Sequence, residues 1–385
     1  MLINKHSRAA FSRRKLVGLL SLQPLLGGVA LAQPTGGSVR IAQSTALSGP
    51  LGDLGTAIHT GAKLAFASIN AQGGVHGRTI ELIVADDAYN IERAVSNVDG
   101  FLSDPNLFAL FNCMGTPAIA AMLPKVVKSG VPFFAPFTGA QFARPKGVRT
   151  IFNVRASYAE EAQKIVQHLT TLGIRKIVVA RQDNAFGSEV MNGVQSAIER
   201  GQGALLPTVV VNADGTNFDQ AIAEVASHRP EALVVGLAGQ PAIDLIKAVR
   251  SELRGLSLYA LSVVGAAGTI TAMGTQGVGV TISQVVPSPY SPLPIAREFL
   301  ASWKAAQISG DPSHLSLEGY INAHVFANAL RRAGPSVSPR SFVDSTWSQK
   351  RHDIGGFESS FVEPGKGASS FVELTMVGRS GRLLR

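Results

Sequence analysis

The stretch "IHTGAKLAFASINAQGGVHGRTIELIVADD", from Ile58 to Asp87, decides the fold class of this 385-residue chain. Its first part carries four apolar residues at helical spacings of four, three and four: Ile58, Ala62, Ala65 and Ile69. Gly73-Gly74 ends that helix, and "IELIVADD" (80–87) follows as a nearly continuous apolar run. Such runs are typical of strands buried on both faces. The stretch therefore predicts a parallel sheet that is covered by helices.

The same alternation of strand and helix continues along the chain. Strand-like runs include "VRIAQS", "LFALFN", "VPFFAPF", "RKIVVA", "LPTVVVN", "EALVVG" and "LSLYAL". Helices are predicted at 93–102, 117–127, 187–200, 218–227, 241–253 and 317–332. About nine strands exceed one comfortable sheet. Breaks are expected at 155–162 and in the proline-rich 285–294, which cannot be a central strand. We predict an α/β protein of two doubly wound lobes, between which the chain passes more than once.

The first 32 residues form a separate segment. They contain five basic residues and no acidic ones, with an apolar run over 16–31 and a small-residue site at 30–32. These are the three parts of a secretory signal peptide, and "SRRKL" (12–16) also fits a twin-arginine signal loosely. The run is short and is broken by Pro24, which argues against the alternative of a membrane anchor. We expect cleavage and a periplasmic protein.

Charge and cysteine usage exclude several classes of function. Basic residues exceed acidic ones by 35 − 26 = 9, and removal of five with the signal leaves a net charge near +4. The remaining basic residues are scattered, whereas nucleic-acid binders cluster them, so we expect no nucleic-acid partner. The single cysteine, Cys113, allows no intrachain disulfide, and no cysteine near the cleavage site could carry a lipid. We expect a soluble monomer.

Four loops at predicted strand ends could bind a ligand, because ligands of open parallel sheets bind beyond the carboxyl ends of the strands. They are "LSGPLGDLG" with Leu54, "NCMGTP" with Gly115 and Thr116, "PFTGAQF" with Thr138 and Gly139, and "RQDNAFG" with Asp183 and Phe186. Thr116 is a good N-cap, and Pro117 suits the first helical position. Two helix starts that face each other form an anion site, most simply for a carboxylate. The alternative is that each threonine only caps its own helix.

Enzyme signatures are mostly absent from the sequence, which lacks the common nucleotide-binding, serine-hydrolase and zinc-peptidase motifs. The eight histidines are dispersed, which argues against a metal cluster. Asp86-Asp87 could pair as acid and base or hold a cation, although a strand end that caps the next helix is the simpler interpretation. Cys113 could be a nucleophile, but no histidine or basic residue lies within several positions to favour its thiolate. We expect no enzyme activity, no metal and no cofactor.

Several stretches are familiar together: "TALSGPLGDLG", "LAFASINAQGGVHGRTIELIVADD", "GVPFFAPFTGA" followed by "FNVRASYAEEA", and "LSLEGYINAHVFANALRRAG". They resemble type I periplasmic substrate-binding proteins, in particular the branched-chain amino-acid (Leu/Ile/Val) branch that serves ABC importers. The resemblance covers nearly the whole chain after the signal. It implies two Rossmann-like lobes joined by three crossovers, with the ligand enclosed between them by hinge motion. The implied division is 38–157 plus 287–356 for lobe I, and 158–286 plus 357–385 for lobe II.

The resemblance also implies ligand-binding residues. The carboxylate-binding hydroxyl falls on Thr116, and the second loop falls on Phe137, Thr138 and Gly139. The aromatic residue of the second lobe falls on Phe186, and the apolar wall near the entrance falls on Leu54. Tyr158 and Tyr290, near the first and second crossovers, look like cleft-lining positions.

The implied function is capture of a small carboxylate-bearing ligand, an amino acid or related organic acid, for the permease and ATPase subunits of an ABC importer. The alternative is a periplasmic sensor of the same fold that feeds a signalling partner. One departure concerns the ligand's ammonium. Amino-acid binders of this family place an acidic residue in the loop after "LSLYAL", where this chain has Ser262. An ammonium buried without a counter-charge costs about 3–5 kcal/mol. Asp183 could substitute from the neighbouring loop; otherwise the ligand is not a plain aliphatic amino acid.

Overall fold

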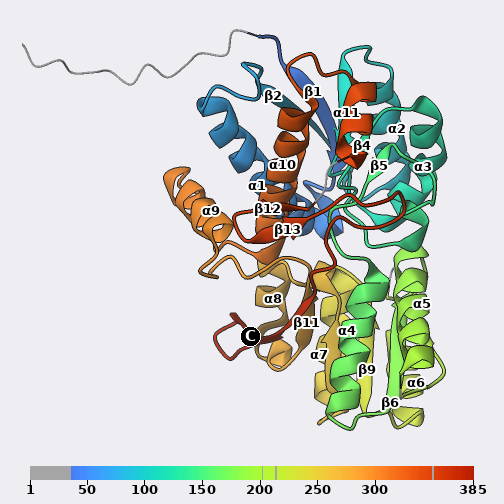
Figure 1. The fold of residues 1–385 in the computed structure, drawn as a ribbon. Coiled ribbons are helices and arrows are strands. Elements are labelled where there is room, and N and C mark those ends of the chain that lie inside the picture. Colours follow the sequence, from blue (N-terminus) through green and yellow to red (C-terminus); the bar gives the residue numbers. More distant parts are fainter. Residues whose placement is uncertain (1–35, 202, 213–214, 349–350) are drawn as a thin grey trace, which may run out of the picture.

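The computed structural model describes residues 36–201, 203–212, 215–348 and 351–385, and the predicted signal peptide at 1–32 lies outside them. The described residues form two lobes, which lie one above the other in Figure 1. None of the helices in this part of the chain is long and apolar enough to cross a membrane.

The upper lobe in Figure 1, lobe I, is built on a five-stranded sheet in the order β2-β1-β3-β4-β5, with all neighbours parallel. The strands are β1 (Val39–Thr45), β2 (Ile80–Asp86), β3 (Leu107–Phe111), β4 (Phe133–Phe134) and β5 (Ile151–Phe152). The helices are α1 (Gly52–Ala71), α2 (Ile91–Leu102), α3 (Thr116–Ser129), α9 (Pro294–Ala305), α10 (His314–Ala333) and α11 (Pro339–Trp347). This confirms the predicted parallel sheet.

The lower lobe, lobe II, repeats this plan with a larger sheet, whose path is β15-β14-β11-β10-β9-β6-β7 with β8 also paired to β6. The strands are β6 (Lys176–Gln182), β7 (Ala204–Leu205), β8 (Val209–Val211), β9 (Ala232–Gly236), β10 (Ser257–Ala260), β11 (Thr281–Gln284), β14 (Glu373–Val377) and β15 (Leu383–Leu384). The helices are α4 (Tyr158–Thr171), α5 (Ala185–Arg200), α6 (Phe218–Ser227), α7 (Gln240–Glu252) and α8 (Ala267–Met273). Only the pairings that involve β14 are antiparallel.

Two strands differ from their predicted form. The run "IELIVADD" was expected to be buried on both faces, but β2 is the edge strand of its sheet and most of its residues are only half-buried. The run "VPFFAPF" forms just the two-residue strand β4. Ala135 adopts a positive φ of 51°, and Pro136 has no N–H to donate, so the strand cannot continue.

The chain crosses between the lobes three times: from β5 to α4, from β11 to α9, and from the hairpin β12–β13 (His352–Ile354, Phe357–Ser359) to β14. The third crossing comes later than residue 357. Phe357, Phe361 and Ala368 belong to the apolar core of lobe I, and Ser369 N donates to Val154 O. Residues 357–369 therefore pack with lobe I rather than lobe II, because their apolar side chains complete its core. The other lobe boundaries remain predictions.

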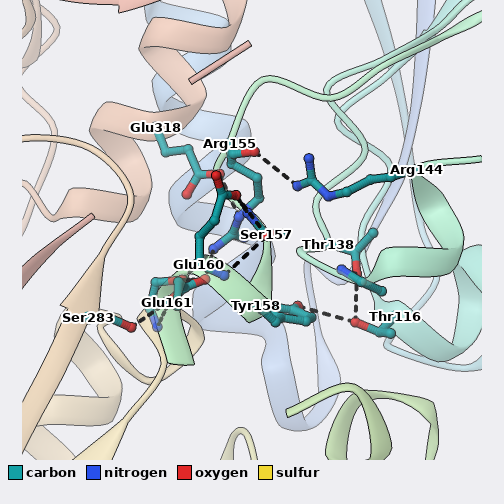
Figure 2. A network of polar contacts seen from close by, with 12 residues as sticks. Thr116, Thr138, Arg144, Arg155, Ser157, Tyr158, Glu160, Glu161, Ser283 and Glu318 are labelled. Carbon is teal, nitrogen blue, oxygen red and sulfur yellow. Dashed lines mark hydrogen bonds and ion pairs between the residues drawn. The ribbon is translucent and has the colours of Figure 1, made fainter. Parts of the chain in front are cut away.

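Helices α1 and α10 touch backbone to backbone in lobe I. A Cβ atom on Gly61 would lie 1.7 Å from Ser316 O, and one on Gly319 would lie 2.0 Å from Ile58 O. Both glycines are thus required for this close approach. The contact fixes the position of α10, which carries Glu318 to the boundary between the lobes (Figure 2).

Candidate functional site

The strand order of each sheet locates an interlobe site. In lobe I the winding direction reverses between β1 and β3, and in lobe II it reverses between β6 and β9. Doubly wound sheets bind ligands at the carboxyl ends of the strands at such a reversal. The four loops concerned contribute Leu54, Thr116, Phe186 and Ala238 to one cavity. The two reversal points therefore face each other across the lobe boundary.

Six of the predicted ligand-binding residues line this cavity: Leu54, Gly115, Thr116, Phe137, Tyr158 and Phe186. Thr138 and Gly139 lie directly behind them, since Thr138 contacts the Thr116 hydroxyl and Gly139 O accepts a hydrogen bond from Tyr158 N. The cavity volume is about 20 Å³, which is room for about one water molecule. A ligand the size of an amino acid needs more space, so its entry requires the lobes or the lining side chains to move apart.

Three hydroxyl groups meet at the cavity wall, as Figure 2 shows. Thr116 Oγ1 lies 2.9 Å from Thr138 Oγ1 and 3.2 Å from Tyr158 OH. Both threonines are fully buried. Hydroxyls can donate or accept by rotating their hydrogens. The cluster can therefore redirect its donors to a bound anion.

The start of α3 leaves the Thr116 hydroxyl available for this cluster. We predicted Thr116 as N-cap and Pro117 as the first helical residue, but the helix begins one residue earlier, with Gly115 as N-cap. Gly115 has φ 102°, which only glycine adopts without strain. No side chain caps α3, so the alternative that Thr116 only caps its own helix is wrong. Thr138 Oγ1 does accept a local hydrogen bond from Ala140 N at 3.2 Å.

A buried arginine lies behind the aromatic wall of the cavity. The Arg155 guanidinium lies over the Phe137 ring at 4.8 Å from its centroid and 5.8 Å from that of Tyr158. Its Nη2 contacts Ser262 Oγ and lies 3.4 Å from Glu161 Oε1, and its Nε lies 3.6 Å from Glu318 Oε1. The Arg155 side chain is only 2% exposed. Because water does not reach Arg155, its charge is balanced by these two carboxylates rather than by solvent.

The two carboxylates beside Arg155 differ in their partners. Glu161 accepts from Ser262 N at 2.9 Å, Ser262 Oγ at 3.1 Å and Ser283 Oγ at 2.6 Å. Glu318 Oε1 has no hydrogen-bond donor among the described residues. Burial raises the pKa of Glu318 to about 7, against the opposing pull of Arg155.

Three predicted site residues lie away from the cavity. The Asp183 side chain is 66% exposed and lies 3.3 Å from Arg181 Nη1. Tyr290 is 61% exposed and lines a different cavity of about 320 Å³. Ser262 is buried and faces Arg155 and Glu161. Asp183 therefore lies outside the cavity, and the acidic side chain beside Ser262 is Glu161, which is not among the residues that line the cavity.

Five of the lining residues were not predicted as ligand-binding from the sequence: Leu51, Tyr89, Met114, Ala238 and Val263. Tyr89 follows β2, so its place at a strand end was the available signal. Its φ of 61° is rare for a bulky residue and follows Ala88 at φ 50°. The carboxylates before them hold this turn: Asp86 Oδ1 accepts from Ala88 N and Asp87 Oδ1 from Tyr89 N, each at 2.9 Å.

The alternative roles for Cys113 and for the aspartate pair find no support in the geometry. Burial raises the pKa of the Cys113 thiol to about 12, which opposes thiolate formation. The Ser48 hydroxyl and nearby backbone amides lower the pKa of Asp86 to about 2, as expected for a carboxylate that holds a turn. No cluster of potential metal ligands occurs among residues 36–385 outside the five positions left undescribed.

Two further hydrogen bonds connect the lobes beside the cavity. Thr269 Oγ1 on α8 donates to Asp53 Oδ2 on α1 at 2.9 Å. Gln141 N in lobe I donates to Glu189 Oε2 on α5 at 2.6 Å. Both contacts require the lobes to be close together.

A family model described as periplasmic binding protein matches residues 38–365. A possible leucine/isoleucine/valine-binding protein from Rhodopirellula baltica has a similar solved structure, with 28% identity, a TM-score of 0.85, and coverage of 92% of this chain and 98% of that one. An ABC transporter solute-binding protein from R. palustris, solved in complex with benzoate, shares 18% identity over 90% of this chain and 95% of its own, with a TM-score of 0.80. At that identity the likeness shows the fold alone.

Among curated relatives, Leu/Ile/Val-binding protein homolog 7 from Brucella suis is 28% identical over 180 residues. The match spans 44% of this chain and 44% of that relative's length.

Proposed function

Since this chain belongs to the periplasmic binding protein family, whose members bind solutes rather than catalyse reactions, we propose that it captures a small apolar carboxylate without an ammonium group. The ligand lies between the lobes, which close around it. The closed, ligand-bound protein is the form that the permease and ATPase of an ABC importer recognise. The predicted signal peptide directs its export to the compartment where it meets this ligand.

The charge around the cavity is the observation that carries this proposal. Three hydroxyls converge there, and the Arg155 guanidinium lies 4.8 Å from the Phe137 ring centroid. The lining residues include no acidic side chain. Hydrogen bonds to a charged group contribute about 1.5–3 kcal/mol each, so several convergent donors offset the cost of burying a carboxylate. An ammonium would find no acidic partner among the lining residues, because the nearby Glu161 is already engaged by Arg155 and two serines.

The remaining lining favours an apolar body on the ligand. Leucine, methionine, valine and aromatic side chains surround the hydroxyls: Leu51, Leu54, Met114, Phe137, Phe186 and Val263. Apolar area buried against them contributes about 25 cal/mol per Å². The R. palustris protein solved with benzoate and a branched-chain amino acid transporter substrate binding protein from Streptococcus pneumoniae solved with isoleucine share this fold, which supports the idea that the lining, rather than the fold, selects the ligand.

A matched pair of compounds tests the proposal. 4-Methylpentanoate and leucine share one apolar group and one carboxylate and differ only in the ammonium. We expect 4-methylpentanoate, and benzoate in parallel, to raise the melting temperature and to bind in calorimetry more tightly than leucine. The amide of 4-methylpentanoate, which lacks the charge, serves as control and is expected not to bind. Tighter binding of leucine, or equal binding of the amide, would contradict the proposed ligand class.

A further inference from the structure

The guanidinium of Arg155 contacts two carboxylates, and this network of three buried groups comes from both lobes (Figure 2). A second buried arginine, Arg144, donates to Arg155 O at 3.0 Å, and its charge interacts most strongly with Glu160. Glu318 belongs to α10 of lobe I, whereas Glu161, Ser262 and Ser283 belong to lobe II. With both carboxylates ionised, the single charge of Arg155 compensates only one of them. A buried unpaired charge is costly, so one proton on the network stabilises this arrangement.

Glu318 is the group that holds this proton. Glu161 accepts hydrogen bonds from two serines and a backbone amide, which stabilise its ionised form. Glu318 Oε1 has only the ion contact with Arg155 Nε at 3.6 Å. A pKa raised by burial to about 7 agrees with this assignment.

We propose that lobe closure takes up a proton at Glu318, so that acidic conditions favour the closed form and strengthen ligand capture. Separation of the lobes would move Glu318 away from Glu161 and the serines of lobe II and admit water to its carboxyl group. The hydrated group then ionises at a lower pH, and the proton is released. This inference rests on the proposed function only in naming the cleft as the place of capture.

Other titratable groups near α10 have partners elsewhere. His59 of α1 contacts Gln43 Oε1, and burial and the charge of Lys63 lower its pKa. Asp53 of α1 accepts from Thr269, and Asp344 of α11 pairs with Arg149. His352 of β12 contacts Asn328 and Arg332, at the far end of α10. His314 precedes Glu318 by one turn, and burial lowers its pKa to about 4, so it is neutral. The charges that act on Glu318 are those of Arg155 and Glu161.

The sign of the effect follows from the raised pKa. A group whose pKa is higher in the closed form favours closure fully below its open-form pKa, and this advantage is lost as the pH rises to about 7. If opening restored the usual value of 4.5, the closed-to-open ratio would fall about 300-fold across that range. Partial hydration gives less, and we expect at least about tenfold.

Distance measurements on the ligand-free protein test this proposal. Lys128 on α3 and Asn192 on α5 are exposed, one on each lobe, and can be replaced by cysteines for spin labels, while the buried Cys113 stays unlabelled. We expect the ratio of short to long interlobe distances to fall at least about tenfold between pH 5 and pH 8. The E318Q variant should show a ratio independent of pH. E373Q is the matched control, because Glu373 on β14 also has a raised pKa but lies outside the network, so it should respond as the unmodified protein does.

A distance distribution that is independent of pH in the unmodified protein overturns the proposal, and so does a pH response that persists in E318Q. Infrared difference spectra between pH 5 and pH 8 give a second readout should E318Q not fold. The unmodified protein should lose one protonated carboxyl band between these pH values, and E373Q should lose the same band. If no such band is lost, the proposal is overturned as well. Because no ligand is present, these results stand whether or not 4-methylpentanoate binds.

Discussion

Thr116 Oγ1 lies 3.2 Å from Tyr158 OH, although Thr116 begins a helix of lobe I and Tyr158 begins a helix of lobe II. The same oxygen lies 2.9 Å from Thr138 Oγ1. Hydroxyl contacts therefore close the boundary between the lobes, and a ligand's carboxylate could accept hydrogen bonds from the same hydroxyls.

Replacement of both threonines by valine, T116V together with T138V, should abolish capture without unfolding the protein. Each lost hydrogen bond to a charged group is worth about 1.5–3 kcal/mol, so we expect affinity for 4-methylpentanoate to fall about 10²- to 10⁴-fold in calorimetry. The free energy of unfolding should fall by about 1–3 kcal/mol, because the buried Tyr158 hydroxyl and Ala140 N lose their partners. T171V, at an exposed helical threonine of lobe II, is the matched control. Unchanged affinity in the double variant would show that the site is elsewhere.

The Asp53–Thr269 contact should stabilise the closed form specifically. T269V removes the donor at 2.9 Å and leaves both lobes intact, so we expect affinity to fall about three- to tenfold with little change in melting temperature. D53N and the double variant complete a mutant cycle that isolates the coupling. K125A breaks an ion pair with Asp99 inside lobe I, and should leave affinity unchanged. A coupling energy of zero between Asp53 and Thr269 would show that this contact does not stabilise the closed form.

Removal of Arg155 should destabilise the protein strongly, because Glu161 and Glu318 would remain buried without a cation. We expect R155M to lower the free energy of unfolding in urea by about 3–5 kcal/mol. At pH 8, adding E318Q to R155M should recover part of this loss, because Glu318 must take up a proton there to become neutral and glutamine need not. If the double variant is no more stable than R155M, Glu318 does not share the charge of Arg155.

A methyl group at the α1–α10 contact should disrupt lobe I. G319A would place a Cβ 2.0 Å from Ile58 O, a distance that the two backbones can relieve only by separating. We expect a loss of several kcal/mol in urea unfolding, or failure to fold. G100A in α2 is the matched control, because a Cβ there meets nothing within 4 Å, and it should stabilise the protein by up to about 1 kcal/mol. Equal stability of the two variants would contradict the close contact.

Much of the site could be predicted because its residues stand at strand ends. Gly115, Thr116 and Phe186 follow β3 and β6 closely in the sequence, and the strand order then brings those loops together. Local chemistry of this kind is visible in a short stretch of chain.

The environment of Ser262 could not be predicted in the same way. Its neighbours, Arg155 and Glu161, come from a crossover and a helix about a hundred residues earlier, and Ser283 comes from another strand. Nothing local indicates that a cation rather than a ligand lies there. Asp183 shows the converse, since its place at a strand end suggested the cleft but its side chain turns outward to Arg181.

The three crossings of the chain have a consequence for the order of events during synthesis on the ribosome. The core of lobe I is completed by α10, by the β12–β13 hairpin and by Ala368, and lobe II still awaits β14 after that point. Neither lobe is a continuous segment of the chain, so neither can reach its final packing before these late segments have been synthesised. The last step of folding for each lobe therefore follows the synthesis of residues far from those that begin its sheet.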